Sequence, residues 1–134
     1  MTVRLSSTEV LDDELVTSKL DTSVVDHEQA VAASNTDHLG IMPAAGEITS
    51  FVALPLVGAG AGESVTVDLH RNGLTMLSAV ATLNQASGTD TVAGTIDPTK
   101  KDFVADDVLT VVRVYTAGAA AMTRTVAKAI INLG

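Results

Sequence analysis

Side chains that commonly carry out chemistry are sparse in this chain and match no catalytic or metal-binding pattern. The histidines, with the carboxylates near the first two, are His27, His38, His70, Asp26, Glu28 and Asp37. A transition-metal site needs several such ligands at spacings that let them converge, and this spacing fits no zinc pattern. The chain has no cysteine, so thiolate ligands and disulfides are excluded. We therefore predict solvated loop histidines and no metal site.

Two further segments contain residue types that bind ions but lack the pattern that binding needs. The acidic pairs Asp12–Asp13 and Asp106–Asp107 could offer carboxylates to calcium, yet no EF-hand spacing surrounds them. The loop Gly58–Gly62 looks like a phosphate-binding loop, but the required lysine is missing and Glu63 stands in its place. A Gly-x-Ser-x-Gly elbow is also absent. We expect no cofactor and no enzyme activity.

The composition argues against several classes of partner. The formal net charge of −8 repels nucleic-acid phosphates, and only Phe51, Phe103 and Tyr115 could stack on bases. No run of about 18 apolar residues could span a membrane. The first residues also lack the basic start and apolar core of a secretory signal. We expect a soluble protein, made in the cytoplasm, that binds neither nucleic acid nor membrane and whose acidity suits a basic protein surface.

The pattern of apolar residues from Val24 onward predicts a single all-β domain, an antiparallel sandwich of the jelly-roll kind. Short runs rich in Val, Thr and Ile are separated by Gly, Asn, Asp and Pro. Asn72-Gly73 predicts a tight hairpin turn. The stretch Leu74–Leu83 also fits a helix, but its position after this turn favours a strand. The predicted strands are 48–57, 63–69, 74–83, 91–96, 108–116 and 122–133.

Two parts of the chain leave alternatives open. The strands 48–57 and 122–133 are apolar on both faces, which fits either contacts between subunits or two-layer packing within one domain. Residues 1–23 have a different composition, with five carboxylates and no glycine, and we assign them to an N-terminal arm. The arm is either a short helical or extended segment that orders on a partner, or a frayed terminus or edge strand.

The stretch Gly58–Leu83 runs from the Gly/Ala loop through Gly-Glu-Ser-Val-Thr-Val and Asn-Gly into an alanine-rich strand. In this order it resembles the head decoration proteins of tailed phages, also called capsid cement proteins. The resemblance continues through Ala93–Ile96, Asp107–Val111 and Tyr115–Gly118. It covers the chain from about Gly46 to the end.

The resemblance implies a structural virion protein on the exterior of a phage capsid. Such a protein would be made in the host cytoplasm, bind the major capsid protein and cement neighbouring capsomers as a homotrimer. The family has no catalytic residues to transfer. The alternative is a phage fibre or spike module that binds host-surface glycans. As candidate contacts with the capsid or between subunits we select Val10, Leu11, Leu15, Phe51 and Leu54.

Overall fold

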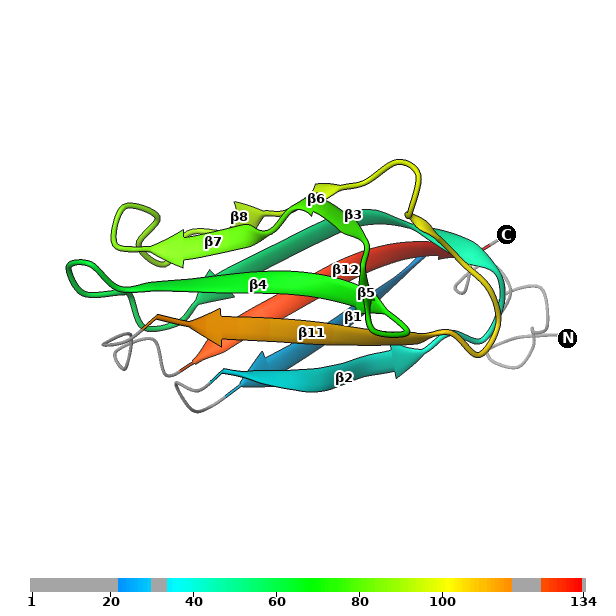
Figure 1. Cartoon of the computed structure of the whole chain (residues 1–134), viewed down its shortest axis with the longest axis horizontal. Coiled ribbons are helices and arrows are strands. Elements are labelled where there is room, and N and C mark those ends of the chain that lie inside the picture. The colour runs from blue at the N-terminus through cyan, green and yellow to red at the C-terminus, as the bar shows by residue number, and fades with distance from the viewer. Residues whose placement is uncertain (1–21, 30–33, 117–123, 134) are drawn as a thin grey trace, which may run out of the picture.

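The chain folds into two antiparallel β-sheets that pack face to face (Figure 1). The structure is a computed structural model and describes residues 22–29, 34–116 and 124–133. Every regular element in these residues is a strand, and none of them forms a helix that could cross a membrane. The prediction of an all-β sandwich is therefore confirmed.

Two five-stranded sheets and one small ribbon make up the fold. The first sheet contains β1 (Thr22–Gln29), β3 (Gly46–Pro55), β8 (Val92–Ala93), β10 (Asp102–Phe103) and β12 (Thr125–Leu133). The second sheet contains β2 (Asn35–Ile41), β4 (Ser64–Arg71), β5 (Leu74–Thr75), β7 (Ala81–Asn84) and β11 (Val108–Tyr115). The ribbon pairs β6 (Leu77–Ala79) with β9 (Thr95–Ile96).

Strands β1 to β4 alternate between the two sheets, and so do β10 to β12. The first sheet has the order β1-β12-β3-β10, with β8 also paired to β3, and the second has β2-β11-β4-β5, with β7 also paired to β4. The C-terminal strands β11 and β12 thus lie between strands from the first half of the chain. Each sheet is complete only when the last third of the sequence has been added.

The core lies between the two sheets and follows the two-residue period of the strands. On β4, Val65, Val67 and Leu69 face inward and are fully buried. On β12, Ala127 and Ala129 do the same, and Ala129 lies opposite the large ring of Phe51. The remaining buried apolar side chains are Met42, Ile48, Ala53, Met76, Leu77, Ala81, Leu83, Phe103, Leu109, Val111, Ile131 and Leu133.

A β-bulge changes the alternation that the sequence predicts for β3. The pairing with β12 shifts between Ile130 and Ile131, which makes Thr49 an extra residue in β3. Ile48 and Phe51 therefore both face the core, and each is 1% exposed. Strict alternation placed these two side chains on opposite faces, and the bulge is the physical reason why that expectation is wrong.

The hairpin predicted at Asn72-Gly73 is confirmed, but the strand after it is interrupted. Asn72 and Gly73 have φ angles of 52° and 86°, and Arg71 pairs with Leu74 across the turn. This is the geometry in which two-residue hairpins match the twist of their strands. The chain then leaves the second sheet to form β6 and returns to it in β7. Ala79 is exposed, although in one continuous strand it would lie on the same side as the buried Leu77 and Ala81.

Strand β1 contains two residues of the predicted arm of residues 1–23, Thr22 and Ser23. Residues 1–21 lie outside the described residues, so the role of the arm stays a prediction.

A buried arginine links the two sheets. Arg113 points inward from β11 and is 0% exposed. Its Nε donates to Oγ1 of Thr125 on β12 at 2.8 Å, and its Nη1 lies 3.3 Å from the Asp37 carboxylate on β2. Burial lowers the pKa of the Arg113 guanidinium, and the charge of Asp37 opposes this effect. The contact therefore ties three strands together from inside the sandwich.

Candidate functional site

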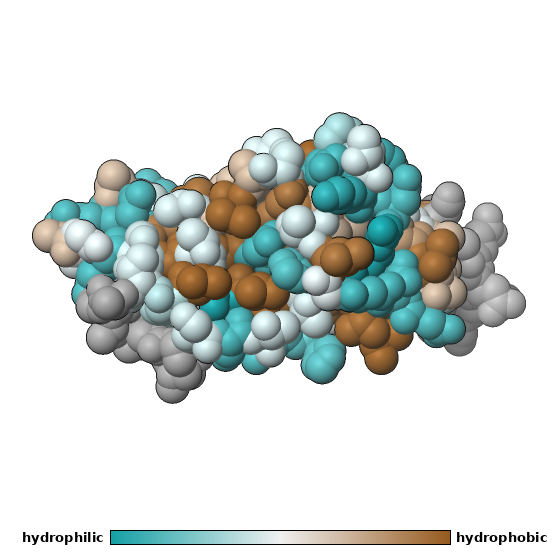
Figure 2. Space-filling view, in the orientation of Figure 1, coloured by the Kyte–Doolittle hydropathy of each residue, from teal (hydrophilic) through white to brown (hydrophobic). Residues whose placement is uncertain are grey.

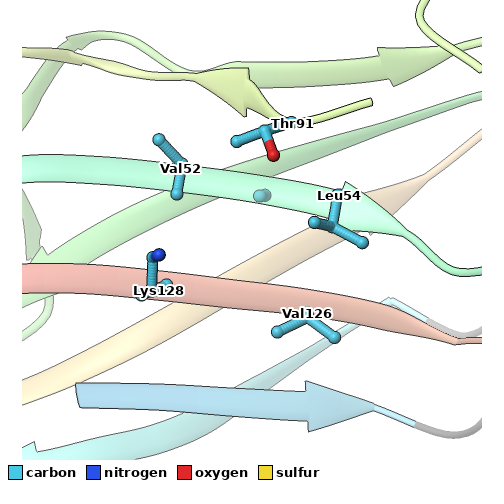
Figure 3. Close-up of a pocket in the computed structure, with 6 residues that line it drawn as sticks. Val52, Leu54, Thr91, Val126 and Lys128 are labelled. Carbon is cyan, nitrogen blue, oxygen red and sulfur yellow. The ribbon is translucent and has the colours of Figure 1, made fainter. Parts of the chain in front are cut away.

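The outer face of the first sheet carries aliphatic side chains at its centre (Figure 3). Leu54 of β3 pairs with Val126 of β12, and Val52 pairs with Lys128. These side chains alternate with the buried residues of the same strands, so they point away from the core. Ile130 follows on the same side of β12. We call Val52, Leu54, Val126 and Ile130 the outer aliphatic face.

A small hollow opens on this face. It has a volume of about 150 Å³ and is lined by Val52, Ala53, Leu54, Thr91, Val126 and Lys128. Figure 3 shows Val52 and Leu54 on one strand, Val126 and Lys128 on the next, and Thr91 above them. Sites for small-molecule ligands usually have volumes of about 300–1,000 Å³. This hollow is therefore smaller than such sites, and most of its lining is aliphatic.

Ion pairs occur on the same sheet around the aliphatic residues. Nε of Arg124 donates to the Glu28 carboxylate at 2.8 Å, and Glu28 pairs with Val126 in the register of β1. Nζ of Lys101 donates to the Glu47 carboxylate at 2.6 Å. The hydrogen bond to Glu28 raises the pKa of Arg124, and that to Glu47 raises the pKa of Lys101. An apolar centre with a polar rim is the usual composition of a protein–protein interface.

Of the five candidate contact residues chosen from the sequence, one lies on the surface, one lies in the core and three lie outside the described residues. Leu54 lies on the outer aliphatic face and lines the hollow. Phe51 is 1% exposed and packs in the core, so its assignment to a contact surface is corrected. Val10, Leu11 and Leu15 lie outside the described residues.

Sequence reasoning did not select Val126 as a contact residue, although a signal for it was present. Its neighbours Thr125 and Ala127 are small residues that fit between the sheets, and both are buried. Val126 must then point outward, because successive side chains of a strand face opposite sides. Only the pairing of β12 with β3 shows that Val126 meets Leu54 there.

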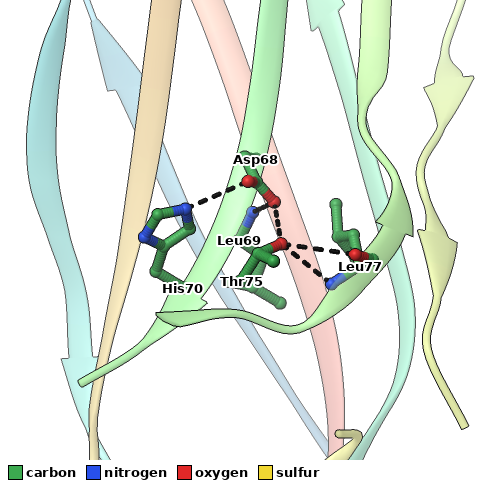
Figure 4. A network of polar contacts seen from close by, with 5 residues as sticks. All are labelled: Asp68, Leu69, His70, Thr75 and Leu77. Atoms are coloured by element: carbon green, nitrogen blue, oxygen red, sulfur yellow. Dashed lines mark hydrogen bonds and ion pairs between the residues drawn. The ribbon is translucent and has the colours of Figure 1, made fainter. Parts of the chain in front are cut away.

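The residues that could have carried chemistry serve the fold. One carboxylate oxygen of Asp68 lies 3.0 Å from Nε2 of His70 (Figure 4). The other oxygen accepts hydrogen bonds from the Thr75 hydroxyl at 2.7 Å and from the Leu69 amide at 2.8 Å. The Thr75 hydroxyl in turn accepts a bond from the Leu77 amide. Asp68 lies on β4, Thr75 on β5 and Leu77 on β6, so the network holds β5 and β6 against β4.

Two histidines and the glycine-rich loop that were also considered as ion-binding candidates lie in strands or form local hydrogen bonds. His27 and His38 lie in β1 and β2, which corrects their assignment to loops. The glycine-rich loop is closed by its own Glu63, whose carboxylate accepts a hydrogen bond from the Gly60 amide at 2.6 Å. Within the part of the chain that the structure describes, no three potential metal ligands converge.

Comparison with known proteins gives a likeness of fold. No protein-family model matches the sequence, and neither does any curated protein. The structure is similar to a chain in the acidic stable capsid structure of Helicobacter pylori bacteriophage KHP30, with a TM-score of 0.55 and 15% sequence identity. The match covers 84% of this chain and 87% of that chain. The likeness therefore extends over two chains of similar length and shows a shared fold.

Proposed function

We propose that this protein is a structural component of a phage virion that decorates the outside of the capsid. In this proposal it binds the major capsid protein, cements neighbouring capsomers and has no enzymatic activity. The observation that carries the proposal is the fold, a sandwich similar over most of its length to a chain of a phage capsid structure. The sequence resemblance to head decoration proteins supports the same role independently.

The outer aliphatic face supplies a surface through which such a protein could associate. Its side chains are only partly covered in the single chain, and paired charges lie around them. A ligand that binds the assembled shell, and not the free coat subunits, stabilises the shell by mass action. Association of the decoration protein with itself would add avidity to weak contacts.

We further propose that the protein forms a homotrimer through the outer aliphatic face. A ring of three copies needs two different patches on each copy that meet at a closing angle. Patches on the two opposite outer faces of one sandwich would instead stack copies into an open fibre. The partner of the outer aliphatic face is therefore an edge or an end of the neighbouring sandwich.

Co-sedimentation tests the capsid role. Purified protein is mixed with expanded capsids of the source phage prepared without it, and separately with free coat subunits. We expect it to sediment with the expanded capsids and to leave the free subunits unbound. Failure to sediment with the capsids would refute the proposal, and calcium-dependent binding to a glycan array would then favour the fibre or spike alternative.

A further inference from the structure

Three strongly exposed aliphatic side chains lie at one end of the sandwich. Leu74, Ile41 and Val104 are 72%, 67% and 59% exposed. They belong to three separate segments: the start of β5, the end of β2 and the connection between β10 and β11. In Figure 2 brown side chains stand among teal ones in the right half of the molecule, where these segments lie in Figure 1.

Asp107 holds these three segments together. Its carboxylate accepts a hydrogen bond from the Asn72 side chain at 2.8 Å, next to the turn that leads to Leu74. Its other carboxylate oxygen accepts one from the amide of Val104 at 2.9 Å. Its main-chain carbonyl accepts one from the amide of Met42, the neighbour of Ile41, at 2.8 Å.

Further bonds fix the same end of the molecule. The Asn72 side chain accepts a hydrogen bond from the Val108 amide at 2.9 Å, and the Asp106 amide donates to the Met42 carbonyl at 2.8 Å. Nη1 of Arg71 donates to the carbonyl of Asp102. These hydrogen bonds hold the backbone that carries the three aliphatic side chains. When a partner binds these side chains, the ordering of the three segments should cost little free energy.

The surroundings of the three side chains are acidic. Asp102, Asp106, Asp107 and Glu47 lie at this end, and their carboxylates outnumber the cations of Arg71 and Lys101. Asp97 and Lys100, in the preceding turn, balance each other. We call Ile41, Leu74 and Val104, with the three aspartates, the acidic tip.

Strand β1 begins at the same end of the sandwich. Thr22, its first residue, pairs with Asn132, and the next residue of β12 pairs with Gly46. Residues 1–21, which precede this strand in the sequence, contain five carboxylates against Arg4 and Lys19.

We infer that the acidic tip is the surface that docks on the capsid, and that its partner is a basic protein surface with apolar pockets. Such a surface complements both the exposed aliphatic side chains and the carboxylates beside them. This inference rests on the proposed capsid role and assigns it to a defined part of the molecule. It also separates the capsid contact from the self-contact proposed for the outer aliphatic face.

The test compares two variants for binding to expanded capsids of the source phage prepared without this protein. The first combines Ile41→Ser, Leu74→Ser and Val104→Ser, and the second is Val114→Ser. Val114 is a matched control, since it is 52% exposed but lies on the outer face of β11. Circular dichroism and thermal melting confirm that both variants fold, as expected for exposed positions.

We expect the triple variant to bind capsids at least about tenfold more weakly than the wild type, because it removes apolar side-chain area that the contact would bury. The control should bind within about twofold of the wild type, since single exposed substitutions outside a contact change little. Raising the salt concentration from about 50 to about 300 mM should weaken wild-type binding, because salt screens charge attraction. Capsid binding that the triple variant retains would overturn this inference alone. A wild-type protein that binds no capsid would overturn both this inference and the proposed function.

Discussion

Arg113 shows how one side chain can specify the relation between the two sheets. Its length lets β11 reach Thr125 on the opposite sheet, and Asp37 offsets part of the cost of burying its charge. A buried arginine is rare in a sandwich core, where most inward positions are aliphatic. The sequence places Arg113 on the same side of its strand as Leu109 and Val111, but the opposite side is also apolar, so only the structure shows that Arg113 faces inward. The sequence does not identify the partners either.

We expect Arg113→Ala to lower the free energy of unfolding by about 3 kcal/mol, because it leaves a cavity and an unpaired Thr125 hydroxyl. Arg124→Ala is the matched control, since Arg124 forms an exposed ion pair with Glu28. That change should have little effect, because exposed ion pairs contribute little. Urea denaturation measures both. Equal stability of the two variants would show that Arg113 is not a link between the sheets.

Asp107 gives the acidic tip a defined dependence on pH. Hydrogen bonds from the Val104 amide and the Asn72 side chain lower the pKa of Asp107 below its ordinary value of 3.8. A carboxylate with a lowered pKa stabilises the fold above the ordinary value. This contribution is lost as the pH falls through the lowered pKa.

Hydrogen exchange at the amide of Val104 should therefore be slow at neutral pH and become faster below about pH 4, after correction for the intrinsic rate. Asp107→Asn removes the titrating group at this position. Its exchange should lack the step in this pH range. If the wild type and the variant show the same acid step, Asp107 does not control the tip.

At the level of elements, two glycines allow close packing between segments. A Cβ atom at Gly46 would collide with the Asn132 carbonyl and lie 2.9 Å from the ring of Phe103. A Cβ atom at Gly94 would lie 2.9 Å from Leu77 and 3.2 Å from Phe51. Gly94 also separates β8 from β9, where the sequence predicts one continuous strand.

Gly46→Ala should destabilise the protein by about 1–3 kcal/mol, because the β3–β12 pair must move apart to admit the methyl group. Gly40→Ala is a suitable control, since the nearest atom to its Cβ would be 3.8 Å away, on Met42. The control should change stability by less than about 1 kcal/mol. Thermal melting distinguishes the two variants. An unchanged melting temperature for Gly46→Ala would contradict the packing described here.

The elements were predictable where local chemistry decides them. Asn72-Gly73 fixes its turn through the positive φ angles that both residues accept, and the alternation of apolar and polar residues in β4 fixes which of its side chains are buried. The bulge at Thr49 and the departure of β6 from the second sheet were not predictable. Both depend on pairing with strands that are distant in the sequence, and a single sequence contains no local signal for such pairing.

At the level of the whole molecule, the two proposed surfaces occupy different places. The outer aliphatic face lies on the first sheet, and the acidic tip lies at the end of the sandwich where β1 begins and β12 ends. Leu54 could be chosen from the sequence because its strand is apolar on both faces. The acidic tip could not, because Ile41, Leu74 and Val104 are far apart in the chain and are brought together by bonds between distant segments, chiefly those of Asp107.

The self-contact can be tested separately from the capsid contact. Leu54→Thr combined with Val126→Thr makes the outer aliphatic face smaller and more polar, and should convert trimers into monomers. Val114→Thr on the second sheet is the matched control and should remain trimeric. Mass photometry measures the three masses directly. A wild-type protein that is monomeric, or a double variant that stays trimeric, would refute the assignment of this face.

The most direct measurement of the central claim is electron cryomicroscopy of capsids incubated with the purified protein. We predict additional density on the outer surface of the shell that fits this sandwich, arranged in threes, with the acidic tip toward the major capsid protein. Particles that show no additional density at saturating protein concentration would contradict the claim that the protein works by decorating a capsid.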